Sequence, residues 1–314
     1  MSAKRWVALV AAAVLFLGMV YVAGRYGGAV PGPAGPWQEA FVQGEGPDKI
    51  AVIDVVGEIV ETGRLPEAAV APDLVSQLQQ AGRDDAVRAV VLDLNTPGGS
   101  VVASDQIHEA VVDLGRAGKP VVASMGEVAA SGGYYIATGA QRIVANPSTF
   151  TGSIGVILVL VNLEGTAGKL GVEPIIIKSG RLKDIGSPFS ELTEEERQIF
   201  QEMIDQSYDR FVDVVAEGRH MSDAEVRELA TGRPYTGAQA RDLGLVDRLG
   251  NFDTAVETAR RLAGVEQATV VRYEPPFSLG ALFGDGFPGL RSPVEELERS
   301  VGVTGPALKY LYVA

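Results

Sequence analysis

The sequence predicts an α/β protein in which a parallel sheet is flanked by helices and follows an N-terminal transmembrane helix. Between residues 49 and 272, short runs rich in β-branched residues alternate with longer segments of helical periodicity. Apolar strands separated by helices are typical of a parallel sheet that is covered on both faces. Apolar residues make up 46% of the 314 residues, which is enough to build a sizeable core.

The first predicted element is the membrane-spanning helix. Residues 6–23 carry no charge, and as a helix they extend roughly 27 Å, about the thickness of the hydrocarbon core. Lys4 and Arg5 precede the helix, and positive charge favours the cytoplasmic side. We therefore expect a single-pass protein of the cell membrane whose remaining residues lie on the extracytoplasmic side. A cleaved secretory signal is the alternative, since Gly27 and Ala29 permit a cleavage site.

The remainder of the chain divides by composition into three parts after an anchor at residues 1–24. Residues 25–48 are a predicted linker, because Gly and Pro are dense there and no periodicity is visible. Residues 49–272 form the predicted domain, and residues 273–314 are a predicted loosely packed tail. The apolar end of that tail, residues 311–314, could occupy a substrate groove, although we expect a frayed end instead.

Local periodicity predicts the elements of the domain in order. Predicted strands cover residues 49–57, 88–95, 119–125, 141–146 and 173–178. Predicted helices between the strands cover residues 72–82, 100–118 and 131–140. Residues 193–219 form a longer predicted helix with one apolar stripe. Ser222 and Glu225 form a capping box that starts the next helix, and residues 236–264 complete the domain.

Composition excludes several classes of function. Acidic residues outnumber basic residues by 40 to 27, and Lys and Arg form no cluster, so we expect no nucleic-acid partner. Cysteine is absent, which excludes thiol nucleophiles, disulfides and thiolate metal sites. Only two histidines, His108 and His220, are present, and no phosphate-binding loop, EF-hand or dinucleotide fingerprint occurs. We therefore expect no metal and no cofactor.

Two glycine-rich segments carry candidate chemistry. In Asn95-Thr-Pro-Gly-Gly-Ser100, Gly98 and Gly99 lie where a strand ends and a helix begins. Backbone N–H groups at such a place can form an oxyanion hole, although an ordinary turn often contains glycine too. In the second segment, Ser131 lies at a strand-to-helix turn and Gly132 follows it. Ser131 is thus a candidate nucleophile with an adjacent oxyanion donor, or alternatively the N-cap of the helix.

The third segment, Lys178-Ser-Gly-Arg-Leu-Lys183-Asp-Ile-Gly-Ser-Pro188, follows the predicted strand at 173–178. A loop lysine is ordinarily solvated. Lys183 becomes a candidate base because neither histidine is well placed: we expect His108 on the solvated side of its helix and His220 at a helix end. A Ser–Lys dyad needs neither histidine.

Taken together, NTPGGS, MGEVAASGGYYIA, TGSIGV and KSGRLKDIGSP resemble, in order and spacing, the signal peptide peptidase SppA family in its short bacterial form. These are serine proteases of the ClpP/crotonase superfamily, and the resemblance covers residues 49–263. It implies a ClpP-like fold, homo-oligomers, and remnant signal peptides in the membrane as the peptide substrates.

The resemblance also implies roles for individual residues. Ser131 matches the nucleophile, Lys183 the general base, and Ser153 the residue that orients the lysine. Gly132 and the pair Gly98-Gly99 match the oxyanion-hole segment.

The implied mechanism makes a physical demand on the lysine. Lys183 would accept the Ser131 proton and deliver it to the leaving amine, so its amine must be uncharged and therefore shielded from water. A carboxylate beside the amine would oppose this, so we expect Asp184 to point away from the dyad. A hydroxyl such as that of Ser153 accepts a hydrogen bond without adding charge. Ala, Gly and Val around the site favour small or aliphatic side chains next to the scissile bond.

Three other functions stay open on the residues alone. One is a Ser–Lys protease that acts on other membrane proteins, of the stomatin-partner type, which usually has additional C-terminal membrane spans. Another is an esterase with a Ser-His-Asp triad, in which residues 129–133 form a variant nucleophile elbow and His220 is the base. The last is a scaffold or a crotonase-like binder of acyl-CoA, which would not need Ser131, Lys183 and Ser153 together.

Overall fold

The computed structural model describes residues 36–62, 68–275 and 308–311. The predicted transmembrane helix at residues 6–23 lies outside the described residues. Among the residues that are described, no helix is both long enough and apolar enough to cross a membrane.

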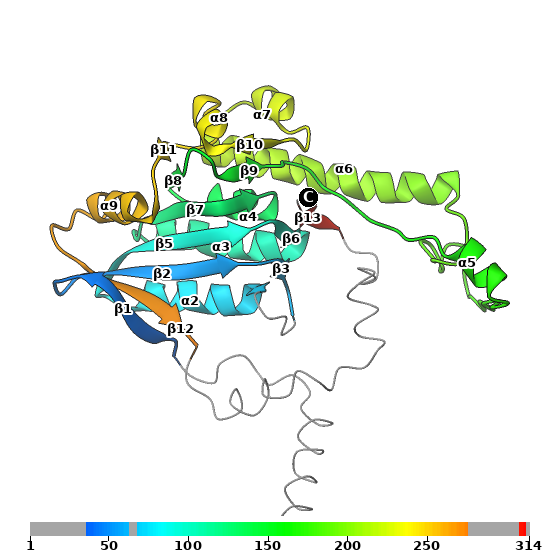
Figure 1. Ribbon diagram of the computed structural model, residues 1–314, viewed down its shortest axis with the longest axis horizontal. Coiled ribbons are helices and arrows are strands. Elements are labelled where there is room, and N and C mark those ends of the chain that lie inside the picture. Colours follow the sequence, from blue (N-terminus) through cyan, green and yellow to red (C-terminus); the bar gives the residue numbers. More distant parts are fainter. Residues whose placement is uncertain (1–35, 63–67, 276–307, 312–314) are drawn as a thin grey trace, which may run out of the picture. The chain divides into compact units, whose positions relative to one another are not determined.

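A twisted, mainly parallel sheet forms the centre of the described chain (Figure 1). Its continuous path has the strand order β1-β12-β2-β5-β7-β8-β11, and only β1 is antiparallel to its neighbour. The strands are β1 (Gln38–Gly44), β2 (Lys49–Val56), β5 (Val87–Thr96), β7 (Val121–Ala130), β8 (Arg142–Ala145), β11 (Arg248–Leu249) and β12 (Thr269–Glu274). The predicted α/β class and the first four predicted strands are confirmed.

The two faces of this sheet pack against different helices. In β2, Ile50 and Val52 face one apolar cluster, whereas Ala51 and Ile53 face the other, as the two-residue period of a strand requires. Helix α9 (Phe252–Leu262) packs on the first face. The second face is covered by α2 (Ala71–Arg83), α3 (Val101–Arg116) and α4 (Gly132–Ala137). The parallel sheet is therefore buried on both sides, which explains its uninterrupted apolar strands.

Short strands bring distant segments to the end of β7. Strand β9 (Phe150–Gly152) runs parallel to the last residues of β7, and β10 (Pro234–Thr236) pairs antiparallel with β9. A second sheet has the order β13-β6-β3-β4. Its strands are β3 (Ile59–Val60), β4 (Ala69–Val70), β6 (Gly98–Ser100) and β13 (Lys309–Leu311). Residues 38–44 of the predicted linker and 309–311 of the predicted tail are thus strands.

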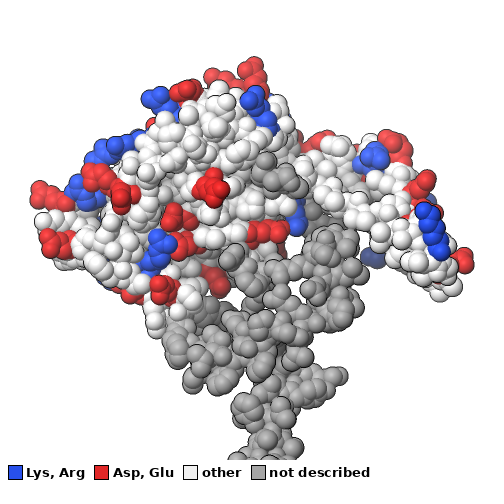
Figure 2. All heavy atoms as spheres, viewed as in Figure 1, with Lys and Arg blue, Asp and Glu red and all other residues white. Residues whose placement is uncertain are grey.

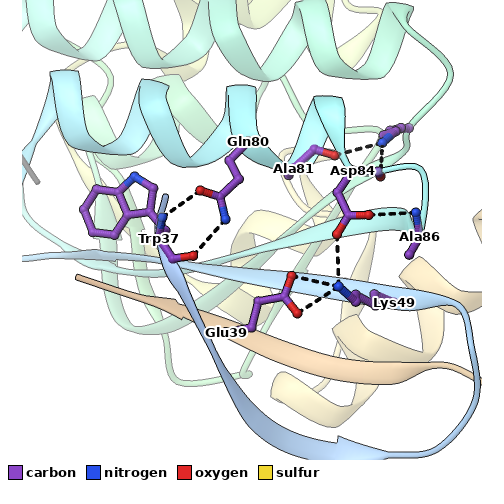
Figure 3. Close-up of polar contacts among 8 residues, drawn as sticks. Trp37, Glu39, Lys49, Gln80, Ala81, Asp84 and Ala86 are labelled. Carbon is purple, nitrogen blue, oxygen red and sulfur yellow. Dashed lines mark hydrogen bonds and ion pairs between the residues drawn. The ribbon is translucent and has the colours of Figure 1, made fainter. Parts of the chain in front are cut away.

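Strand β1 is held to α2 where the described chain begins (Figure 3). The Trp37 N–H donates to Gln80 Oε1 (2.7 Å), and Gln80 Nε2 donates to the Trp37 carbonyl (2.9 Å). Lys49 Nζ bridges Glu39 and Asp84. Because half-exposed ion pairs add little stability, the buried indole of Trp37 and its paired amides are the main attachment.

Residues 158–192 form an arm that leaves this core and includes α5 (Glu164–Lys169). The sequence predicts a strand at residues 173–178, and this is wrong: the segment forms no strand, and Ile175 and Ile177 are 85% and 96% exposed. A β-branched run becomes a strand only when a neighbour supplies hydrogen bonds, and the described chain supplies none here.

The arm returns to the core through α6 (Glu194–Arg219), which begins with a capping box of Thr193 and Glu196. The buried residues of α6 all lie in its C-terminal third, from Phe211 onward. Its N-terminal half extends toward α5 (Figure 1), and Met203 on its predicted apolar stripe is 45% exposed. The predicted capping box of Ser222 and Glu225 starts α7 (Asp223–Leu229), and α8 (Gly237–Asp242) follows.

Candidate active site

Ser131 occupies a strained turn between β7 and α4. Its backbone has φ 53° and ψ −115°, a region that residues with a Cβ rarely adopt. The Ser131 N–H donates to the Gly152 carbonyl (2.8 Å), and the Tyr135 N–H donates to the Ser131 carbonyl (2.8 Å). These bonds hold the turn from both sides, as in the strand-to-helix elbows that expose a nucleophile.

The Ser131 side chain is buried and has no hydrogen-bond partner among the described residues. The residue is 1% exposed, and its Oγ contacts no donor or acceptor within hydrogen-bonding distance. Ser131 does occupy the N-cap position of α4, but its side chain makes no capping bond. Leaving a buried hydroxyl unpaired costs about 1–3 kcal/mol. The N-cap role therefore does not explain this serine, whereas a reactive role does.

Backbone from two other elements approaches this turn closely. Gly98 has φ 99°, and a Cβ there would lie 2.6 Å from the Gly132 nitrogen. A Cβ on Gly99 would lie 2.0 Å from the Ile59 carbonyl oxygen. Neither position tolerates a side chain, so the glycines do more than permit an ordinary turn.

Only part of the predicted oxyanion segment has N–H groups that are free to donate a hydrogen bond. The Gly98 N–H already donates to Thr96 Oγ1 (3.1 Å), a bond that the sequence does not predict. Gly132 is the first residue of α4, where N–H groups have no acceptor within the helix. Of Gly98 and Gly132, the second is therefore better placed to donate to an oxyanion.

Ser153 lies beside Ser131 because of the register between β7 and β9. Ala130 is paired with Gly152, so the two serines directly follow paired positions of parallel strands. Ser153 is buried, has φ 51°, and donates its N–H to the Arg233 carbonyl (3.1 Å). It also lines a groove of about 570 Å³ that runs toward α6.

An extended chain already lies in the site. Strand β13 runs antiparallel to β6, with Tyr310 opposite Gly99. On its other side, Lys309 exchanges two backbone hydrogen bonds with Ile157 (3.0 and 3.1 Å). The segment is thus bound between two edges as an added strand, the way many proteins bind extended peptides. Of residues 311–314, for which the sequence predicts a frayed end, only Leu311 lies within the described residues, and it belongs to β13.

The carbonyl of Tyr310 points at the glycines beside Ser131. Its oxygen lies 2.1 Å from the position that a Cβ on Gly98 would take and 3.1 Å from that of a Cβ on Gly132. Both glycines are therefore needed for the approach of a peptide carbonyl, which is the group that an acyl-transfer site must hold.

Lys183 does not join this group within the described chain. It belongs to the segment between α5 and α6, and Figure 1 shows α5 to the side of the core, away from α4. Its side chain is exposed, and it forms no hydrogen bond or ion pair with any described residue. The structure thus brings Ser131, Ser153, Gly98, Gly99 and Gly132 together and leaves the predicted base outside.

Asp184 pairs with Lys178. Its Oδ1 is 2.5 Å from the Lys178 Nζ. This hydrogen bond holds the pKa of Asp184 below its ordinary value. The carboxylate therefore has a different partner and leaves the Lys183 amine unopposed.

Neither histidine bonds to Ser131, so the Ser-His-Asp triad is not assembled. The sequence predicts His108 on the solvated side of its helix, and this is wrong: its ring packs edge-on against Tyr135, at 5.2 Å between centroids, and its Nδ1 is buried without a partner. The reason is that Tyr135 of α4 packs on that side of α3, where Arg210 of α6 also pairs with Asp105. His220 is exposed at the C-cap of α6.

Burial of His108 makes the stability of the fold depend on pH. Burial lowers the pKa of His108 to about 4, from about 6.5 in an unfolded chain. Between these values the unfolded state binds more protons, so the free energy of unfolding should fall by up to about 3 kcal/mol as the pH drops from about 6.5 to about 4. Denaturant titrations at several pH values measure this for the wild type and for His108→Gln. In His108→Gln the free energy of unfolding should depend less on pH, whereas His220→Gln should keep the dependence of the wild type. The same pH dependence in all three proteins would contradict this account.

Charged groups in the described part of the chain suggest neither a metal site nor a nucleic-acid surface. No cluster of three or more His, Asp or Glu suited to a metal is found among the described residues. On the face that Figure 2 shows, acidic and basic side chains are interspersed over the described residues. That face offers no broad basic patch of the kind that binds nucleic acid.

Comparison with known proteins points to one family of proteases. The model of peptidase family S49 matches residues 113–266, and that of the Clp proteases matches residues 53–150. The chain is 39% identical to a protein of Enterococcus faecium that is provisionally named signal peptide peptidase SppA. That alignment covers 76% of this chain and 70% of the relative.

Longer relatives match over a similar share of this chain. Protease 4 of Haemophilus influenzae is 39% identical over 72% of this chain, and the chloroplastic serine protease SPPA of Arabidopsis thaliana is 33% identical over 74%. The alignments cover 37% and 35% of those two proteins. The chain thus spans little more than a third of the length of these relatives.

Proposed function

The chain belongs to peptidase family S49, the SppA-type serine proteases, and we propose on that basis that it is a membrane-anchored endopeptidase that degrades remnant signal peptides with a Ser131–Lys183 dyad. The observation that carries the proposal is the Ser131 hydroxyl. It is buried, has no hydrogen-bond partner in the described part of the chain, and lies in a strained turn beside Gly98 and Gly132.

The proposed chemistry is acyl transfer. Ser131 Oγ attacks the peptide carbonyl while Lys183 takes its proton, and Lys183 then protonates the amine that leaves. The Gly132 N–H stabilises the oxyanion. Ser153 hydrogen-bonds the lysine amine and so orients it without adding charge. Water then releases the acyl group from Ser131 by the same steps in reverse.

We place the two halves of the dyad on different copies of the chain. Among the residues that the structure describes, Ser131 Oγ is buried and has no base beside it, whereas the exposed Lys183 amine has no acceptor. The groove beside Ser153 has room for a lysine side chain to enter. A base that enters this groove from a second copy would be shielded from water, as the mechanism requires.

The apolar surface of the arm supports assembly of copies. Val172, Ile175 and Ile177 are all more than half exposed, and Met203 on α6 is 45% exposed. Exposed apolar residues that gather in one segment in this way support an interaction site. A neighbouring copy would bury it and would give residues 173–178 the strand partner that they lack.

The proposed membrane anchor is supported by the sequence, and the proposed substrate class is supported by the name of a relative. Residues 6–23 are uncharged and follow Lys4 and Arg5, which favours a single span with the protease domain on the extracytoplasmic side. The substrate class is supported by the name of the E. faecium relative. An anchored site would meet signal peptides where they remain after release from their preproteins.

The test is hydrolysis of a synthetic signal peptide by the full-length protein in detergent micelles. We expect fragments from the wild type and none from Ser131→Ala. The matched substrate is the same peptide still joined to its folded preprotein, which should resist cleavage because it cannot enter the groove as an extended strand. Cleavage of the preprotein or of other membrane proteins with the free peptide left intact would contradict the proposed substrate.

A further inference from the structure

The side chain of Lys309 forms an ion pair at the candidate active site. Its Nζ lies 2.8 Å from Glu58 Oε1, and the two side chains are 29% and 35% exposed. The backbone of Lys309 is held at the same time, because it pairs with Ser100 of β6 and exchanges two hydrogen bonds with Ile157. Glu58 therefore contacts a side chain of an extended segment that lies where a peptide substrate would bind.

The register of β13 gives the position of Lys309 relative to the reacting bond. The carbonyl of Tyr310 lies against Gly98 and Gly132, where the oxyanion of an acyl transfer would form. A substrate bound in this register would be cut after the residue at the Tyr310 position. Lys309 therefore marks the second residue before the scissile bond.

Backbone hydrogen bonds fix the turn that carries Glu58. The Gly57 N–H donates to the Asn95 carbonyl (3.0 Å), and the Ala69 N–H donates to the Glu58 carbonyl (3.0 Å). The next residue, Ile59, is fully buried and begins β3. The turn is thus already ordered before a peptide binds, which lowers the entropy cost of a contact with the carboxylate.

The charge of Glu58 is available to a substrate. Among the described residues, Glu58 forms an ion pair with Lys309 alone, so a peptide that takes the place of β13 meets a carboxylate without another cation. A partly exposed ion pair adds little to the stability of a fold. A few-fold difference in rate is nevertheless enough to choose among the bonds of one peptide.

We propose, on the premise of the function proposed above, that Glu58 selects lysine or arginine as the second residue before the scissile bond. Signal peptides begin with a basic region that is followed by an apolar region. When Glu58 holds the last basic side chain, the first residue of the apolar region lies directly before the scissile bond. The enzyme therefore cuts a remnant signal peptide one residue beyond its last basic residue and separates the charged end from the apolar segment.

The test uses three peptides that share the sequence Ala-Leu-X-Tyr-Leu of residues 307–311 and carry lysine, methionine or glutamate at X, with the full-length protein in detergent micelles. Lysine should exceed methionine by about 3- to 5-fold in kcat/KM, as a partly exposed ion pair allows. Lysine should exceed glutamate by about 10-fold or more, because repulsion replaces attraction. Both ratios should shrink in about 1 M NaCl, which screens charges.

Two variants change the carboxylate, and a third is the matched control. Glu58→Gln should make the lysine and methionine peptides equivalent, and Glu58→Lys should make the glutamate peptide the best of the three. Glu61→Gln removes a carboxylate three residues further along the chain and should leave all ratios unchanged. Thermal unfolding of each variant checks that the fold is retained.

A longer peptide tests the choice of bond directly. When its single lysine is moved by two residues, mass spectrometry should show the cleaved bond moving with the lysine in the wild type but not in Glu58→Gln. Ser131-dependent cleavage at equal rates for the three short peptides, or an unchanged lysine preference in Glu58→Lys, would overturn this inference alone. The absence of any Ser131-dependent cleavage would overturn the proposed function and the inference with it.

Discussion

Replacement of Ser131 by alanine is expected to lower kcat/KM for peptide hydrolysis by at least about 10⁴-fold, because no other group in the site can form the acyl intermediate. The same change should leave the free energy of unfolding equal to or above that of the wild type. The reason is that Ser131 Oγ is buried without a partner, so its removal relieves a desolvation penalty of about 1–3 kcal/mol. Steady-state kinetics and thermal unfolding measure the two effects.

Ser124 provides the matched control, since it is a buried serine in the same strand, β7. Ser124→Ala should retain activity near that of the wild type. A Ser131→Ala protein that keeps more than a hundredth of the activity, or that unfolds more easily than the wild type, would argue against a reactive role.

The second large effect is expected at Lys183. Lys183→Arg should lower kcat/KM by at least about 10³-fold, nearly as much as Lys183→Ala. Arginine keeps the positive charge but cannot give up its proton near neutral pH, so it cannot serve as the base. The fold should be unaffected in both variants, because the side chain is exposed and unpaired among the described residues. Kinetics and thermal unfolding of the two variants check this.

Lys178→Arg tests whether the loss is particular to Lys183. Lys178 lies in the same arm and pairs with Asp184, and arginine can keep that pair. Its activity should stay within a few-fold of the wild type. If Lys183→Arg retained more than a tenth of the activity, the residue would act through its charge, and the proposed base would be wrong.

Local sequence was sufficient to predict a strand where its pairing partner is nearby in the chain or where both faces of the sheet are covered. Strands β2 and β5 are apolar on both faces, and this pattern is visible without knowing the fold. Strands β1 and β13 were not predicted, because their character depends on pairing with β12 and β6, more than 200 residues away. No short-range pattern encodes such a pairing.

The same distinction holds for the site. Ser131 and Gly132 stand out in the sequence because a strand-to-helix turn and small residues are local features. The pairing of β9 with β7 then places Ser153 beside Ser131. The contact between Tyr310 and Tyr135 was not predicted, although an aromatic residue so close to Ser131 offered a signal. The periodicity of α3 predicts its apolar stripe, but it could not show that Tyr135 of α4 packs against His108, which lies outside that stripe.

Residues 173–178 show a different limit of prediction from the sequence. Their β-branched run has the composition of a strand, yet no strand of the described chain lies beside it. The composition is consistent with pairing in an assembly, which neither one sequence nor one chain displays. Lys183 follows this run, and a pairing in an assembly would also explain why Lys183 lies apart from Ser131 within one chain.

A complementation experiment tests most directly whether two copies share the dyad. Ser131→Ala and Lys183→Arg proteins, each inactive alone, are co-expressed with different tags and the mixed assemblies are isolated through both. In these assemblies an intact serine can meet an intact lysine from its neighbour, so activity should return to about a quarter of the wild-type value. Mixed assemblies that stay as inactive as either parent, or a protein that forms no assemblies, would contradict a dyad shared between copies.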